Sequence, residues 1–128
     1  MLIFFSGSKG FHVGLPTSLW DPPPSADFNR LARRFAERVA EQAGITIDVG
    51  IYDKVRALRA PNSRHPKTGR HKLRLSFKEL THLATDIMLQ RAQQPEPFDL
   101  PDRPTANEQA AADWQQAARD FEGEKSIQ

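Results

Sequence analysis

Two short segments of this sequence carry side chains that could bind phosphate groups. The first runs Ser6-Gly-Ser-Lys-Gly-Phe-His12 and combines glycines with hydroxyl, ammonium and imidazole groups. Glycines let the backbone approach a ligand closely, and Ser8, Lys9 and His12 can all donate hydrogen bonds to phosphate oxygens. The segment lacks the spacing of a Walker A loop. The alternative interpretation is a glycine-serine hairpin turn, in which His12 is a surface histidine or one whose hydrogen bonds are satisfied within the protein.

The second segment extends from Asp53 to Gly69 and places one acidic residue ahead of a series of cations. The basic side chains in it are Lys54, Arg56, Arg59, Arg64, His65 and Lys67. A carboxylate beside arginines is suited to a divalent cation that carries a triphosphate, because the oxygen binds the ion while the arginines bind the phosphates. The alternative is a structural ion pair between Asp53 and Arg56 within a basic loop.

The net charge of the 128 residues is only +2, but it is unevenly distributed. Residues 54–78 contain nine basic side chains and no acidic one, whereas residues 95–128 contain three basic and eight acidic residues. The strongly basic residues 54–78 favour contact with phosphate groups. The alternative is that they form a basic surface exposed to solvent. The absence of cysteine excludes a disulfide framework and a thiolate zinc site, and the four histidines form no HExxH pattern.

Short strands are predicted on both sides of the first segment and after the second. Residues 2–5 are continuously apolar and residues 11–15 alternate, so the first segment should be the turn between two strands. Residues 45–51 also alternate and predict a strand with one buried face. Residues 71–75 predict a further short strand, with its two leucines facing inward and its basic residues facing outward.

Three helices are predicted around these strands. The first covers residues 25–43 with Ser25 as its N-cap, and the second begins at the capping box of Ser76 and continues to Met88. The third begins at a second capping box, at Thr105, and carries an apolar stripe of Trp114, Ala117, Ala118 and Phe121. Its acidic side chains are expected to dock on the basic middle of the chain or on a partner.

In this order, the two segments resemble the motifs of the archaeo-eukaryotic primase superfamily. That superfamily includes the small catalytic subunit of DNA primase, the primase-polymerases of plasmids and phages, and the polymerase domain of bacterial end-joining ligases. The resemblance implies that Ser8, Lys9 and His12 bind the triphosphate of the incoming nucleotide. It also implies that Arg59 and His65 make further contacts with that triphosphate.

The resemblance extends to a catalytic carboxylate and to the template. It implies that Asp53 is the catalytic residue that completes a site for Mg²⁺ or Mn²⁺, with Asp48 as a competing ligand. Candidates for contact with a DNA template are Arg56, Lys67, Arg70 and Lys72.

The sequence departs from the family before the glycine turn. The family carries a pair of acidic metal ligands on a preceding strand, but only Met1-Leu-Ile-Phe-Phe5 stands here. The chain therefore resembles the C-terminal half of a catalytic core, and a partner chain or an upstream segment is expected to supply the missing acidic strand. Because one carboxylate binds Mg²⁺ weakly, we expect this chain alone to bind nucleotide or DNA better than it catalyses. An exposed sheet edge is expected to favour self-association.

These inferences predict an α+β fold, with a mixed or antiparallel sheet and helices on one face, as a truncated primase-polymerase catalytic core. Residues 1–94 form the primase-like half-domain, and residues 95–128 form a proline-rich linker with an acidic helical tail. The expected function is primer synthesis on a DNA template from nucleoside triphosphates by a nucleotidyltransferase. A non-catalytic nucleic-acid-binding module that uses residues 54–78 is the alternative. No membrane partner is expected, and the expected location is cytoplasmic, because no apolar run approaches the ~20 residues of a membrane span.

Overall fold

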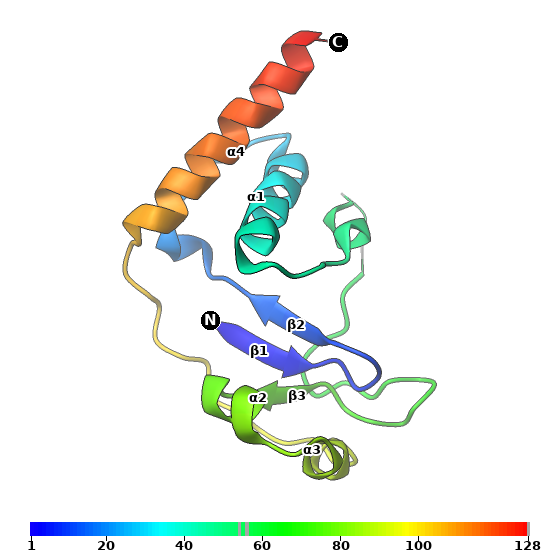
Figure 1. Ribbon diagram of the computed structural model, residues 1–128. Coiled ribbons are helices and arrows are strands. Elements are labelled where there is room, and N and C mark those ends of the chain that lie inside the picture. Colours follow the sequence, from blue (N-terminus) through cyan, green and yellow to red (C-terminus); the bar gives the residue numbers. More distant parts are fainter. Residues whose placement is uncertain (54, 56, 128) are drawn as a thin grey trace. The chain divides into compact units, whose positions relative to one another are not determined.

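A computed structural model of the protein describes residues 1–53, 55 and 57–127, so Lys54 and the predicted template contact Arg56 lie outside the described residues (Figure 1). The chain forms two compact units, each built from two stretches of sequence. Unit 1 comprises Met1–Pro16 and Leu58–Arg103, and unit 2 comprises Thr17–Ala57 and Pro104–Gln128. The expected boundary between residues 94 and 95 stays a prediction.

Among the described residues, none of the helices has both the length and the apolar character that crossing a bilayer requires.

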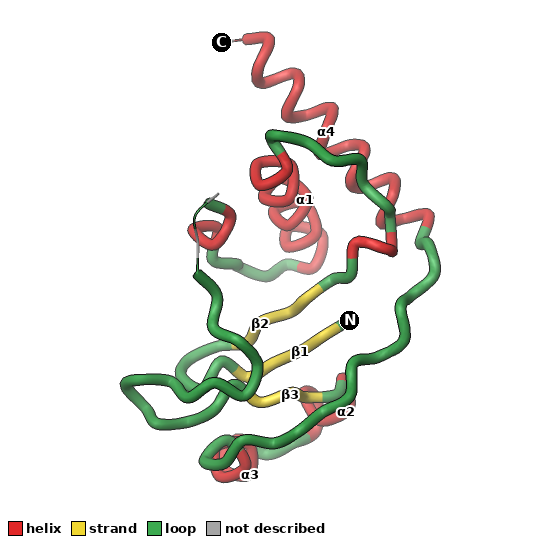
Figure 2. Tube along the Cα trace, turned by 180° about the vertical axis from the view of Figure 1, so that it is seen from behind, coloured by secondary structure: helices red, strands yellow, loops and turns green. Residues whose placement is uncertain are grey.

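Unit 1 contains a three-stranded antiparallel sheet (Figure 2). Its strands are β1 (Leu2–Phe5), β2 (Phe11–Gly14) and β3 (Leu73–Leu75), in the order β2-β1-β3. The predicted strands on both sides of the glycine turn are confirmed, as is the α+β class. The apolar run of β1 is explained by its central position, because a strand with neighbours on both sides buries most of its surface.

One face of this sheet forms the core of unit 1. Ile3, Phe5, Leu73 and Leu75 are buried there, and leucines of two short helices pack against them. The inward orientation predicted for the two leucines of β3 is confirmed. The helices are α2 (Phe77–His82) and α3 (Thr85–Arg91), and their apolar side chains cover this face.

The prediction of one continuous helix after Ser76 is wrong, although its capping box is confirmed. Ser76 accepts a hydrogen bond from the Glu79 amide at 3.0 Å, and the Glu79 carboxylate accepts one from the Ser76 amide at 3.0 Å. The backbone becomes extended at Leu83, which ends α2, and α3 begins at Thr85. This break lets Leu83 and Met88 both reach the sheet, so tertiary packing outweighs the helical periodicity.

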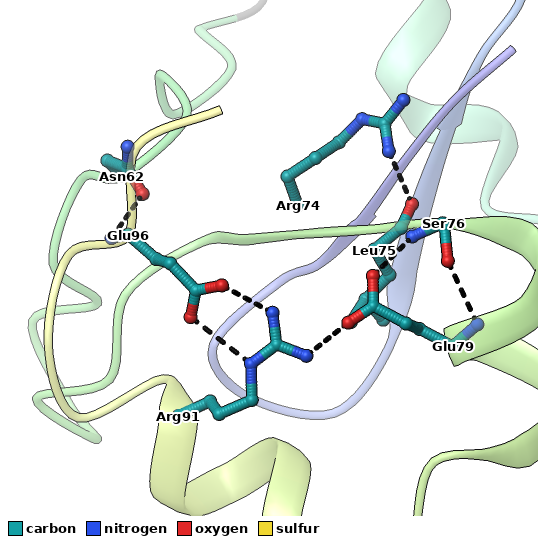
Figure 3. Close-up of polar contacts among 7 residues, drawn as sticks. All are labelled: Asn62, Arg74, Leu75, Ser76, Glu79, Arg91 and Glu96. Carbon is teal, nitrogen blue, oxygen red and sulfur yellow. Dashed lines mark hydrogen bonds and ion pairs between the residues drawn. The ribbon is translucent and has the colours of Figure 1, made fainter. Parts of the chain in front are cut away.

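Arg91 joins the two short helices to the segment that follows them (Figure 3). Its guanidinium donates to the carboxylates of Glu79 and Glu96, and the Glu96 amide donates to the side chain of Asn62 at 3.2 Å. The Ser76 amide and Arg91 lower the pKa of Glu79, and hydrogen bonds to Glu96 and Glu79 raise the pKa of Arg91. The network therefore ties the residues after α3 to Asn62.

Unit 2 is a helical unit built around aromatic side chains. Its elements are two 3₁₀ turns, η1 (Thr17–Leu19) and η2 (Val49–Tyr52), and two helices, α1 (Phe28–Ala43) and α4 (Glu108–Ile127). Trp114 stacks on Trp20 at 5.4 Å between ring centroids, and Phe35 contacts both rings. The apolar stripe predicted for the last helix therefore forms much of this core.

The strand predicted over residues 45–51 is wrong. Residues 45–48 form no regular element, and η2 follows them. Asp48 caps η2 by accepting from the Gly50 amide at 2.9 Å, and the Asn29 side chain donates to the Tyr52 carbonyl at 3.0 Å. Alternation predicts a strand only where another strand is available for pairing, and these local bonds hold the segment beside α1 instead.

Both helices of unit 2 start later than the sequence predicted. The N-cap of α1 is Asp27, and Ser25 instead accepts a hydrogen bond from the Asp27 amide at 3.0 Å. The helix α4 begins at Glu108, where the Asn107 side chain accepts from the Ala110 amide at 2.9 Å. Both Ser25 and Thr105 therefore lie outside the helices that they were predicted to cap.

The acidic helix α4 docks on the basic helix α1. Asp113 is buried and accepts a hydrogen bond from Arg38 at 3.1 Å, while Lys125 reaches Asp27 at 3.2 Å. Burial alone would raise the pKa of Asp113, but hydrogen bonds from Arg38 and two glutamines outweigh it and lower that pKa. The acidic tail was expected to dock on the basic middle of the chain, residues 26–94, or on a partner, and within unit 2 it contacts the α1 part of that middle segment.

Candidate phosphate-binding site

The glycine turn between β1 and β2 is held by its own hydrogen bonds. The Ser6 amide donates to the Gly10 carbonyl at 2.9 Å, and the Ser6 hydroxyl accepts from the amides of Ser8 and Gly10 at 3.2 and 3.3 Å. Gly7 has a φ of +90°, which a residue with a side chain rarely adopts. The sequence therefore fixes a compact turn, which leaves Lys9 exposed and Ser8 partly exposed.

The loop of residues 58–71, called here the basic loop, packs directly on this turn. Arg59 donates to the Ser6 carbonyl, and the Thr68 hydroxyl donates to the Gly7 carbonyl at 2.6 Å. A Cβ on Gly7 would lie 2.9 Å from the Arg70 carbonyl oxygen, so only glycine allows this approach. Unit 1 thus brings together the glycine turn and the part of the second segment that contains Arg59 and His65.

The basic loop closes on itself around His65. The His65 amide donates to the Arg70 carbonyl at 2.7 Å, and the Gly69 amide donates to the His65 carbonyl at 2.9 Å. Nδ1 of His65 accepts from the Lys67 amide at 3.1 Å, so in the neutral ring the proton resides on Nε2. His65 therefore has one ring nitrogen left to donate to a ligand.

His12 and Lys72 lie on the face of the sheet opposite the apolar core. His12 pairs with Phe4 across β1 and β2, and Nζ of Lys72 lies 5.1 Å from the centre of the Phe4 ring. Lys72 is only 3% exposed and donates to the Arg59 carbonyl at 3.0 Å. The expectation that the basic residues around β3 all face outward is wrong for Lys72, because the chain at Arg59 covers it.

On this face of the sheet the positive charges of Lys72 and Arg59 lie close to each other and to His12. Burial, Lys72 and Arg59 lower the pKa of His12, and burial and Arg59 lower the pKa of Lys72. Nδ1 of His12 is buried and has no hydrogen-bond partner among the described residues. Both shifts mean that this part of unit 1 disfavours additional positive charge.

Carboxylates do not neutralise these cations within unit 1, all of whose residues are described. The ion pairs within unit 1 all belong to Arg91, whose partners are Glu79 and Glu96. The lysines and arginines of the turn and the basic loop, together with the adjoining Lys72, are Lys9, Arg59, Arg64, Lys67, Arg70 and Lys72. Lys9, Arg64 and Lys67 are exposed, and Arg70 is partly exposed. Unit 1 therefore presents a concentration of positive charge beside a turn with free polar groups.

Asp53, the predicted catalytic and metal-binding residue, belongs to unit 2. It follows η2, is exposed, and lines an open pocket of about 470 Å³ together with Ser25, Ala26, Phe28 and Asn29. No three His, Asp or Glu side chains among the described residues are grouped so that they could hold a metal ion. One exposed carboxylate does not fit a divalent metal site by itself, so we derive no chemical step through Mg²⁺ or Mn²⁺. The role of Asp53 stays a prediction.

Sequence reasoning missed Thr68, whose hydroxyl joins the basic loop to the turn. The neighbouring glycine was a usable signal, because Gly69 has a φ of +73° and permits the tight turn that places Thr68.

Comparisons with family models, with curated proteins and with solved structures found no match to this chain.

Proposed function

We propose that unit 1 is the triphosphate-binding part of a primase-type nucleotidyltransferase. The observation that carries the proposal is the contact between the glycine turn and the basic loop, through Arg59 on Ser6 and Thr68 on Gly7. This contact gathers Ser8, His12 and His65 with several cations into one part of a small unit. The same residues carry the resemblance of the two segments to the primase superfamily.

The chemistry of the site supports a polyanionic ligand. Phosphoryl transfer depends mainly on positioning and on neutralising the charge of the phosphate groups. Lysine and arginine side chains bind phosphate oxygens with charge-assisted hydrogen bonds, and the Ser8 hydroxyl and the His65 ring add further donors. The proposed role of unit 1 in transfer of a nucleotide to a 3′-hydroxyl is therefore to bind and orient the triphosphate.

The second candidate is a nucleic-acid-binding module without catalysis. The exposed side chains of Lys9, Arg64 and Lys67 favour it, because cations on a surface loop suit the phosphates of a strand. If this second candidate is right, the partly exposed His12 and the buried Lys72 have no role in binding.

Nucleotide binding by the purified chain tests the proposal. A fluorescent, non-hydrolysable nucleoside triphosphate is titrated against the natural chain, His12→Ala and His82→Ala. His82 is the matched control, because it is an exposed histidine on α2 and also belongs to unit 1. We expect His12→Ala to weaken binding about tenfold, as loss of a hydrogen bond to a charged group does, and His82→Ala to bind normally.

The same titration separates the two candidates. A single-stranded DNA that binds with the same affinity to both variants, and that excess triphosphate does not displace, would favour the nucleic-acid-binding module. Absence of triphosphate binding by the natural chain would refute the proposed function.

A further inference from the structure

Lys72 is an internal cation of unit 1. Its residue is 3% exposed although it stands in a basic segment, between His71 and the buried Leu73 of β3. A lysine next to a strand can usually extend its ammonium to water, but the side chain of Lys72 contacts the Phe4 ring and the backbone of the basic loop. The Lys72 ammonium is therefore held inside unit 1 by the groups that it contacts.

The contacts of the ammonium are neutral. Nζ donates to the Arg59 carbonyl at 3.0 Å and lies 5.1 Å from the centre of the Phe4 ring. No carboxylate within unit 1, whose residues are all described, forms an ion pair with it. A buried charge without an opposite charge destabilises a fold, and the lowered pKa of Lys72 has the direction that this cost predicts. We therefore expect an apolar side chain at this position to stabilise the free protein.

Lys72 is also connected to the glycine turn through Arg59. Its ammonium holds the Arg59 carbonyl, while the Arg59 guanidinium donates to the carbonyls of Ser6 and Ser63, the latter at 3.2 Å. Arg59 is thereby fixed at both its backbone and its side chain. Lys72 therefore helps to hold the start of the basic loop on the glycine turn, through the hydrogen bond that it donates to Arg59.

We propose that Lys72 is a positioning residue of the triphosphate site, which holds Arg59 on the glycine turn and contributes a buried positive charge that the phosphates of the ligand balance. This inference rests on the proposed function. It assigns to Lys72 a role beneath the bound ligand in place of a surface contact with a DNA template. It also gives a role in ligand binding to the buried charge of Lys72, which destabilises the free protein.

The test compares three chains, the natural one, Lys72→Met and Lys78→Met, for thermal stability and for binding of inorganic tripolyphosphate. Methionine preserves most of the volume of lysine and removes its charge. Lys78 is the matched control, because it is an exposed lysine on α2. We expect Lys72→Met to raise the Tm of the free protein and to weaken tripolyphosphate binding about tenfold or more. Lys78→Met should leave both quantities near those of the natural chain.

The opposite signs of the two effects distinguish this role from a merely structural one. A Lys72→Met protein that loses stability and affinity together would show that the lysine only supports the fold, and one that keeps its affinity would show that the charge is not used. Either result overturns the inference while the natural chain still binds tripolyphosphate. If the natural chain binds neither tripolyphosphate nor a nucleoside triphosphate, the proposed function and this inference both fail.

Discussion

Binding of a polyphosphate to unit 1 should take up a proton at His12. In the free protein, burial and the charges of Lys72 and Arg59 lower the pKa of His12 from its ordinary value of 6.5, so the ring is neutral at pH 7. Phosphate oxygens placed beside these groups reverse the local charge and favour the protonated ring. Affinity should therefore increase as the pH falls from 8 towards 6.

The size of this effect is bounded by a single titrating ring. One group can take up at most one proton, so its contribution to the affinity changes by at most about tenfold for each pH unit, equivalent to about 1.4 kcal/mol. The groups that face His12 within unit 1 are Lys72 and Arg59, and Phe4 lies opposite it in the sheet.

Calorimetry measures the proton directly. The natural chain and His12→Gln are titrated with a non-hydrolysable triphosphate at pH 6.5 in two buffers of different ionisation enthalpy. Protonation of the ligand itself, near pH 6, occurs with both proteins and cancels in the comparison. We expect the natural chain to take up more protons than His12→Gln. Equal proton uptake by the two proteins would refute the assignment of His12 to the phosphate site.

Three further predictions concern the fold. Gly7→Ala should lower the free energy of unfolding of unit 1 by about 1–3 kcal/mol in denaturant unfolding, because Gly7 has a positive φ and lies against the Arg70 carbonyl. Gly10→Ala should lower it less, because a Cβ at Gly10 meets no atom within 4 Å. Equal losses in the two variants would contradict this reasoning. Asp113→Ala should lower the free energy of unfolding of unit 2 by about 1–3 kcal/mol. Asp120 is exposed, and Asp120→Ala should lower it much less. The pKa of Glu79 is lowered from 4.5, so its ionised carboxylate stabilises the fold above that pH, and this stabilisation is lost as acid protonates it. Glu79→Gln should therefore make the Tm decline less steeply below pH 4.5 than it does in the natural chain.

The local chemistry of unit 1 was predictable from the sequence. The apolar run of β1, the glycines of the turn and the serine of the capping box each determine their own backbone geometry, so their elements are found where expected. The contact between the turn and the basic loop was expected only through the resemblance to primases. The structure provides its physical basis in Gly7, which has no side chain to keep the loop away.

Elements that depend on distant partners were not predictable in the same way. The alternating residues 45–51 would suit a strand, but residues 45–48 form no regular element, and the bonds made by Asp48 and Asn29 hold residues 49–52 as a 3₁₀ turn beside α1. The periodicity after Ser76 would suit one helix, but the sheet is covered better by two. Lys72 stands in a basic run that is typical of surfaces, and only the path of the chain at Arg59 places it inside.

The central claim is that a triphosphate binds at the glycine turn and the basic loop. Its most direct test is a titration of the ¹⁵N-labelled chain with a non-hydrolysable nucleoside triphosphate, followed through the backbone amide resonances. We predict that the largest shifts belong to residues 8–12 and 65–70 and saturate together with a single dissociation constant. Shifts confined to the arginines of α1 and to Lys125 on α4, or no saturable shifts in unit 1, would contradict the account.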